Sequence, residues 1–245
     1  MNYQWVTLLR YSDVFLAAAW VTLQVTVLAF ILAITLGLLA ALARLCRVGA
    51  LRLIAVGYIE IIRNTPVLLQ IFIVFFALPS LGLTLGAWTA GIIALGVNVG
   101  AYLAEVFRAG IQAVPRGQLE AASILGIDRR QVFIHVVLPQ AVRAVYPAII
   151  NNLVQLLLGT SLLSAIALPE LTGTATVVNA RTLLYIQTFS ITLGVYLIMS
   201  NALVWLGGLL GRRMFHPPLA MTVKKKHPLL GLMPLRNKLK NGGVA

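Results

Sequence analysis

Few residues in this sequence could carry out chemistry on a bound molecule. The three histidines, His135, His216 and His227, have no second histidine or carboxylate at a spacing that would hold a metal ion. The six Asp and Glu are scattered and offer no carboxylate pair for acid–base catalysis, and no GxxxxGK[ST] loop is present to bind nucleotide phosphates. We therefore expect no catalytic residue, no metal site and no cofactor, and no ATP hydrolysis by this chain alone.

The polar residues that could contact a ligand lie inside apolar stretches. Asn151, Gln155 and Gly159 recur at a spacing of four, which places them on one face of a helix. Pro147 and Gly159 could interrupt that helix, and interrupted helices hold polar substrates in many transporters. The candidate ligand path comprises Asn98, Asn151, Asn152, Gln155, Thr160 and Ser161. The alternative is that these side chains only form hydrogen bonds between helices.

A short helix of small residues is predicted over 118–125, in the segment QLEAASILGID. Gly126 fits the position after a helix end, where a left-handed residue closes the helix, and Asp128 with Gln131 is typical of a capping box for the next helix. One narrow face of the first helix carries Leu119, Ala122, Ser123 and Gly126. Such a face could enter a groove on another protein, or the helix could simply pack beneath its own bundle.

The elements that must position these residues are membrane helices. Hydrophobic residues make up 60% of the 245 and charged residues 10%, against about 45–50% and about 25% in soluble domains. An apolar helix of about 20 residues crosses a bilayer, and a Pro/Gly-rich turn, PSLGLTLG, divides the longest uncharged run. We expect an all-helical integral membrane protein with five spans, at about 16–42, 58–79, 87–108, 139–165 and 184–210.

The distribution of Lys and Arg predicts the orientation of these spans. With the N-terminus outside, all but two of the 19 Lys and Arg lie in inner segments, as cytoplasmic loops require; the exceptions are Arg10 and Arg181. The formal net charge of +13 is spread over loops that flank the spans, which argues against nucleic-acid binding. Cys46 is the single cysteine, so no disulfide can form within the chain.

The chain divides into three predicted parts. Residues 1–13 form an outer N-terminal segment that does not resemble a signal peptide. Residues 14–211 form the membrane domain, with a cytoplasmic loop at 112–138. Residues 212–245 carry eight cations and no acid, a composition that cannot build a core. We expect a basic cytoplasmic tail that either attracts anionic lipid or is simply solvated.

The loop resembles the EAA loop of ABC importer permeases, whose pattern is EAA, three residues, Gly, nine residues, an aliphatic residue, any residue and Leu-Pro. The matching positions are Glu120, Ala121, Ala122, Gly126, Val136, Leu138 and Pro139, with Val where Ile is usual. The resemblance implies that Leu119, Glu120, Ala121, Ala122, Ser123 and Gly126 form a coupling helix. That helix would seat in a cleft of a separate ABC ATPase subunit.

A second segment, EIIRNTPVLLQ at 60–70, is similar to a stretch of the polar amino acid importers of the histidine, glutamine, glutamate, arginine and opine types. In this segment Glu60 and Arg63 could pair at the inner interface, and Pro66 should break a helix. Family members often carry a charged residue just before the Thr-Ser of the fourth span, where this chain has Leu158 and Gly159. A second permease subunit would then have to supply the charged contact.

Together these resemblances imply a pore-forming permease of the bacterial inner membrane, rather than an enzyme, with its N-terminus outside and its C-terminus in the cytoplasm. The implied partners are ABC ATPase subunits, an extracytoplasmic amino-acid-binding protein, a second permease subunit (the same chain or a paralogue) and the lipid bilayer. The alternative is an ATP-independent carrier or channel, which would need no docking helix.

Overall fold

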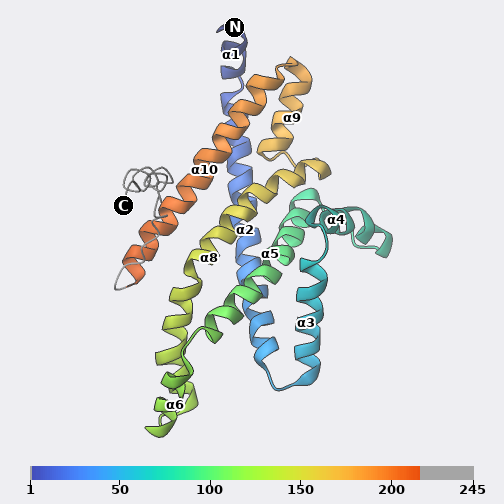
Figure 1. The fold of residues 1–245 in the computed structure, drawn as a ribbon. Helices are drawn as coiled ribbons and strands as arrows, with labels where there is room; N and C mark the ends of the chain where they lie inside the picture. The colour runs from blue at the N-terminus through green and yellow to red at the C-terminus, as the bar shows by residue number, and fades with distance from the viewer. Residues whose placement is uncertain (1, 216–245) are drawn as a thin grey trace, which may run out of the picture.

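The computed structural model describes residues 2–215, and every regular element in this range is a helix. Four stretches are long and apolar enough to cross a membrane: α2 (Ser12–Leu45), α5 (Ala87–Gln112), the stretch Arg129–Ile166 and α10 (Tyr185–Met214). They contain the first, third, fourth and fifth predicted spans, which confirms an all-helical membrane protein. Figure 1 shows α2 running along the long axis of the molecule, with α8 and α10 crossing beside it.

The second predicted span, 58–79, is wrong as a single helix. Helix α3 (Gly49–Arg63) begins earlier and stops before Pro66, and the chain then turns by 108° into α4 (Val67–Phe72). The expected break at Pro66 is thus confirmed: proline has no N–H to continue the helix, and its ring disfavours a helical residue before it. A π-helical turn, η1 (Ile73–Ala77), and a 3-10 turn, η2 (Leu78–Leu81), follow α4.

Arg63 lies at the end of α3 that is remote from the α2–α3 turn. Helix α3 runs beside α2 from the α2–α3 turn and ends at Arg63, where α4 turns away near the middle of the long axis (Figure 1). At about 1.5 Å per residue, Arg63 is about 20 Å along the helix from Gly49. Arg63 is therefore not part of the α2–α3 turn, whereas the charge count assigned it to that inner segment.

The long fourth helix accommodates its prolines in two ways. It comprises α7 (Arg129–Val132), the π-helical turn η3 (Phe133–Val137), α8 (Leu138–Gly159) and the 3-10 helix η4 (Thr160–Ile166). The widened turn η3 directly precedes Leu138 and Pro139, as η1 precedes Leu78 and Pro79, and a wider turn relieves the crowding that a proline ring causes. Helix α8 continues through Pro147 without a break, but it changes to 3-10 geometry after Gly159, where an interruption was predicted.

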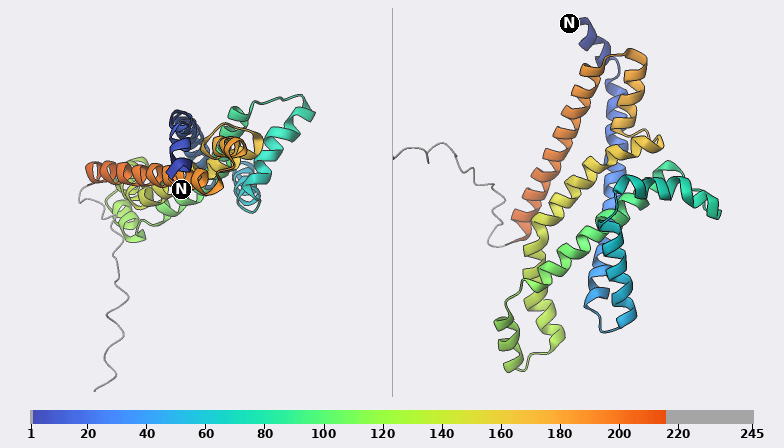
Figure 2. Two further views of the ribbon diagram at one scale, coloured as in Figure 1. Left: turned by 90° about the horizontal axis from the view of Figure 1, so that it is seen from above. Right: turned by 45° about the vertical axis from the view of Figure 1, so that its right-hand side comes forward.

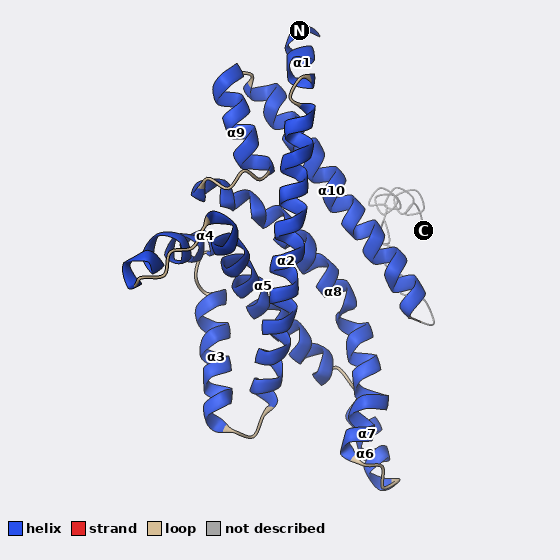
Figure 3. Ribbon diagram, turned by 180° about the vertical axis from the view of Figure 1, so that it is seen from behind, coloured by secondary structure: helices blue, strands red, loops and turns tan. Residues whose placement is uncertain are grey.

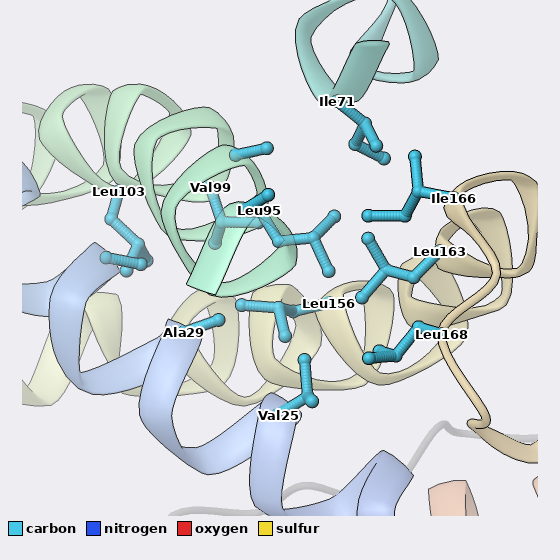
Figure 4. Close-up of a cluster of buried hydrophobic side chains, with 13 residues drawn as sticks. Val25, Ala29, Ile71, Leu95, Val99, Leu103, Leu156, Leu163, Ile166 and Leu168 are labelled. Atoms are coloured by element: carbon cyan, nitrogen blue, oxygen red, sulfur yellow. The ribbon is translucent and has the colours of Figure 1, made fainter. Parts of the chain in front are cut away.

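The core forms where α2 and α5 approach closely. A Cβ at Gly37 of α2 would lie 2.8 Å from Leu103 Cβ and 2.9 Å from the carbonyl oxygen of Gly100, so this contact requires glycine. Around it, apolar side chains from α2, α4, α5, α8 and η4 interdigitate (Figure 4). Such close contact is typical of membrane helices, where association depends on packing rather than on the exclusion of water.

The two ends of the molecule carry different short helices. Helix α6 (Arg116–Ile124) lies at the end that also holds the α2–α3 turn, whereas α1 (Asn2–Leu9) and α9 (Leu171–Thr182) lie at the opposite end (Figures 1 and 3). The segment from α4 to η2 projects to one side of the bundle (Figure 2). Helix α9 was not predicted. The predicted tail beyond residue 215 lies outside the described residues.

Candidate functional site

A cavity of about 390 Å³ opens between α4, α5 and α8. Its polar lining residues are Asn98, Tyr102, Asn152 and Gln155, and its other lining residues are Val67, Leu95, Val99, Leu156, Leu158 and Gly159. The lining contains no charged side chain. Three residues of the predicted ligand path therefore meet in one cavity, although Asn98 is far from the other two in the sequence.

The remaining predicted path residues lie outside this lining. Asn151 is exposed. Thr160 is fully buried, and its hydroxyl donates to the carbonyl of Leu157 at 2.6 Å. The Ser161 hydroxyl donates to the carbonyl of Leu158 at 2.7 Å. These two hydroxyls bond to carbonyl groups in the last turn of α8, so both are occupied within their own helix.

Asn98 is connected to the bend between α3 and α4. Its Nδ2 donates to Oε1 of Gln70 at 3.0 Å, and Gln70 is only 9% exposed. The Nε2 of Gln70 in turn donates to the carbonyl of Ile62 at 2.9 Å and to the hydroxyl of Thr65 at 2.8 Å. Asn98 thus has both predicted roles: it forms a hydrogen bond to another helix, and it also lines the candidate ligand cavity.

The predicted pair of Glu60 and Arg63 is not formed. Glu60 accepts a hydrogen bond from Nδ2 of Asn64 at 3.2 Å. The guanidinium carbon of Arg63 lies 5.4 Å from the ring centroid of Tyr102, a cation–π arrangement. Since Tyr102 lines the cavity, Arg63 contacts a wall of the cavity without itself belonging to the lining.

The predicted coupling helix, α6, ends as the sequence indicated. Gly126 is left-handed, with φ +68°. Its N–H donates to the carbonyl of Ser123 at 3.1 Å, and the N–H of Ile127 donates to that of Ala122 at 3.1 Å, which together form a Schellman motif. Asp128 caps α7 by accepting from the N–H of Arg130 at 3.0 Å.

The exposed face of α6 differs somewhat from the predicted one. Ala122 is 5% exposed and therefore faces the chain itself, whereas Glu120, Ala121 and Ser123 are exposed. Two large apolar side chains at the end of the helix, Ile124 and Leu125, are 86% and 75% exposed. Large apolar side chains this exposed on a short polar helix are typical of a protein interface.

An ionic cluster joins the ends of α2 and α5, close to the loop that leads from α5 to α6. Arg108 donates to Oε2 of Glu105 at 2.6 Å, and Arg44 of α2 pairs with the other carboxylate oxygen. Arg108 also donates to Oε1 of Gln112 at 2.5 Å, one turn before the loop to α6. Residues 2–215 contain no group of three His, Cys, Asp or Glu side chains placed to hold a metal ion.

A second polar cluster lies at the opposite end, where Glu170 caps α9. Its carboxylate accepts from the N–H of Thr172 at 2.9 Å, from that of Gly173 at 2.6 Å and from the hydroxyl of Tyr196 at 2.8 Å. Burial raises the pKa of Glu170, and these three hydrogen bonds oppose the rise. The carboxylate has a structural role, because its three hydrogen bonds cap α9 and hold the start of that helix against α10.

The helical architecture and the loop at one end agree with a comparison of the sequence with protein families. Residues 8–216 match the binding-protein-dependent transport system inner membrane component family. The chain belongs to this family.

Similar proteins in this permease family include amino-acid transporters. The chain is 38% identical over 179 residues to a probable amino-acid ABC transporter permease of Sinorhizobium fredii, covering 73% of this chain and 78% of that protein. It is 40% identical over 162 residues to the L-cystine transport system permease TcyB of Bacillus subtilis, covering 66% and 69%. It is 39% identical over 175 residues to a probable glutamine permease of the same organism, covering 70% and 80%.

Solved structures agree with this membership. A crystal structure of an amino acid ABC transporter with histidines matches with a TM-score of 0.81 and 34% identity, over 86% of this permease and 98% of that chain. A chain of the inward-facing MetNI methionine ABC transporter has the same fold, with a TM-score of 0.67 and 20% identity, over 82% and 95%. The chain is therefore an inner-membrane, multi-pass permease.

Two residues of this region were not predicted from the sequence: Tyr102, which lines the cavity, and Gln70, which contacts Asn98 of the lining. Gln70 was quoted only as part of a motif, and Tyr102 was not considered. Gln70 could have been found, because a Gln one turn beyond Pro66 can reach the carbonyl groups that the proline leaves without a donor. No local signal marks Tyr102, whose contact with Arg63 depends on how α3 packs against α5.

Proposed function

We propose that this permease is the pore-forming subunit of an ABC importer for a polar amino acid. Family membership supports the importer, and the relatives named for amino acids, cystine and glutamine support the substrate class. The cavity fits such a cargo, because its volume of about 390 Å³ lies in the range of small-molecule sites and carboxamide groups line an otherwise largely apolar wall.

The coupling to ATP hydrolysis is assigned to α6. The observation that carries this role is the pair of highly exposed apolar side chains, Ile124 and Leu125, next to the left-handed Gly126 at one end of the molecule. An ABC ATPase subunit would receive this end, with Glu120 at the contact. The ATPase lies in the cytoplasm, so the N-terminus and α9 face outward, where an amino-acid-binding protein delivers the substrate.

The translocation path runs past the cavity lined by Asn98, Asn152 and Gln155. Because Gln155 is exposed on this chain, a second permease subunit encloses the path in the membrane. That subunit is the same chain or a paralogue, and it supplies any charged contact that Leu158 and Gly159 do not provide.

Reconstitution in liposomes tests this function. The permease with its ATPase and binding protein should accumulate a polar amino acid only when ATP is supplied, and the purified permease alone should hydrolyse no ATP. An ATP-independent carrier would instead transport without the ATPase subunits and respond to an ion gradient. Uptake by the isolated permease would contradict the importer assignment.

A further inference from the structure

The bend at Pro66 leaves backbone groups that Gln70 satisfies. In a continuous helix the N–H of residue 66 would donate to the carbonyl of Ile62, but proline has no N–H. The Nε2 of Gln70 takes over that bond at 2.9 Å and also donates to the Thr65 hydroxyl at 2.8 Å and the Thr65 carbonyl at 3.2 Å. Two of these acceptors are carbonyl oxygens, which can only accept, so the Gln70 amide nitrogen must face them.

The orientation of the Gln70 amide determines that of the Asn98 amide. With Nε2 facing the bend, Gln70 presents Oε1 to Asn98, and an oxygen acceptor requires a donor opposite it. Asn98 therefore presents Nδ2 to Gln70, at 3.0 Å. Because Asn98 lines the cavity and its Nδ2 is turned to Gln70, its Oδ1 is left to accept from a ligand.

Asn152 is oriented in the same sense by its own helix. Its Nδ2 donates to the carbonyl of Ala148 at 2.8 Å, so its Oδ1 is likewise the atom left for a ligand in the same cavity. Two lining residues, one from α5 and one from α8, thus each have a carboxamide oxygen left to accept, and the lining contains no charged side chain. Oxygen acceptors of this kind bind N–H groups, and they bind a charged ammonium group more strongly than a neutral one.

We propose that Gln70 is a positioning residue that fixes Asn98 so that the cavity presents oxygen acceptors to the ammonium group of the transported amino acid. This inference rests on the proposed function, since it assigns to that cavity the part of the substrate it recognises. It also gives the bend a second role, because the geometry of the α3–α4 junction sets the polarity of the site.

Two substitutions separate positioning from a structural role at the bend. Gln70→Met keeps the length of the side chain but removes its acceptor, so Asn98 is free to rotate, and the dissociation constant should rise about 10- to 100-fold. Gln70→Glu keeps an oxygen acceptor for Asn98 and, when protonated, one donor for the bend, so binding should stay within about threefold of wild type. Gln24→Met is the matched control, a glutamine in α2 that lines a different groove.

Binding is measured on the purified permease–ATPase complex, without the binding protein, by calorimetry. The probes are L-glutamine and two compounds that each lack one of its groups. 4-Aminobutanamide lacks the carboxylate, and 4-carbamoylbutanoate lacks the ammonium group. We expect wild type to bind the first two and to lose the third. Asn98→Leu and Asn152→Leu should each weaken binding of the amine, whereas Asn201→Leu, which removes an equivalent bond to Leu197 on α10, should not.

The probe and variant measurements test the ammonium assignment and the positioning role of Gln70 separately. Equal binding of 4-carbamoylbutanoate and 4-aminobutanamide, or no binding of any probe, would overturn the ammonium assignment. If Gln70→Glu assembles with an unchanged melting temperature but binds as weakly as Gln70→Met, Gln70 acts only at the bend. If Gln70→Met fails to assemble, Gln70→Glu is compared with wild type: binding within about threefold supports the positioning role, and a loss of about tenfold or more at an unchanged melting temperature overturns it. ATP-driven uptake by wild type is measured separately, so the importer assignment can stand when the positioning role fails.

Discussion

At the scale of single residues, Gly126 and Glu120 test the coupling role of α6. Gly126 has φ +68°, where a Cβ costs about 1–2 kcal/mol, but beyond its own residue and its two chain neighbours that Cβ would meet no atom within 4 Å. Gly126→Val should therefore insert in the membrane at near-normal levels, yet occupy space that the ATPase needs. Glu120→Lys reverses a charge at the contact. We expect each to reduce uptake at least tenfold and to lower ATPase recovery in pull-down assays.

The control for this experiment is Gly117→Val. A Cβ at Gly117 also meets nothing within 4 Å, and Gly117 has no positive φ. If Gly126→Val and Glu120→Lys transport normally with the ATPase attached, α6 is only an interfacial loop. Loss of the protein from the membrane would show instead that Gly126 is needed for folding.

Gln155 tests the ligand path at the same scale. Its side chain lines the cavity and is exposed on this chain, so Gln155→Leu removes hydrogen-bonding capacity without opening a hole in the core. Loss of one such bond costs about 1–2 kcal/mol, so we expect uptake to fall about 5- to 30-fold while the ATPase still assembles. Asn201→Leu on α10 should leave uptake unchanged. Normal uptake by Gln155→Leu would assign this face to helix packing.

At the scale of elements, the contact of α2 with α5 holds the bundle together. Gly37→Leu forces a side chain against Leu103 and the Gly100 carbonyl, and overpacking of this kind costs about 1–3 kcal/mol. We expect a lower melting temperature for the purified permease. Gly208→Leu on α10, where a Cβ meets nothing within 4 Å, should leave it unchanged. Equal effects of the two substitutions would show that this contact does not limit stability.

At the scale of the whole molecule, the orientation in the membrane can be tested by cysteine labelling. Gln131 belongs to α7 and Ala180 to α9, which lie at opposite ends of the molecule (Figure 3), and both residues are exposed. After Cys46→Ser, Ala180→Cys should react with an impermeant maleimide in intact cells and Gln131→Cys only after permeabilisation. The reverse pattern would remove the proposed topology and, with it, the access of a cytoplasmic ATPase to α6.

Local features of the sequence determined the membrane helices and their interruptions. Hydropathy located four long helices, Pro66 marked the bend, and Gly126 marked the end of α6. These predictions succeeded because each depends on neighbouring residues: an apolar run, a missing N–H, or a left-handed residue that only glycine adopts readily.

Only the tertiary structure decided which polar groups meet. The sequence paired Arg63 with Glu60, but the packing of α3 against α5 places Arg63 beside Tyr102. It grouped Thr160 with Gln155, but the 3-10 turn after Gly159 keeps Thr160 out of the cavity lining. Asn98 faces Gln70, 28 residues earlier, because α4 folds back onto α5. Packing between distant segments selects these hydrogen-bond partners, so the local periodicity of the sequence cannot predict them.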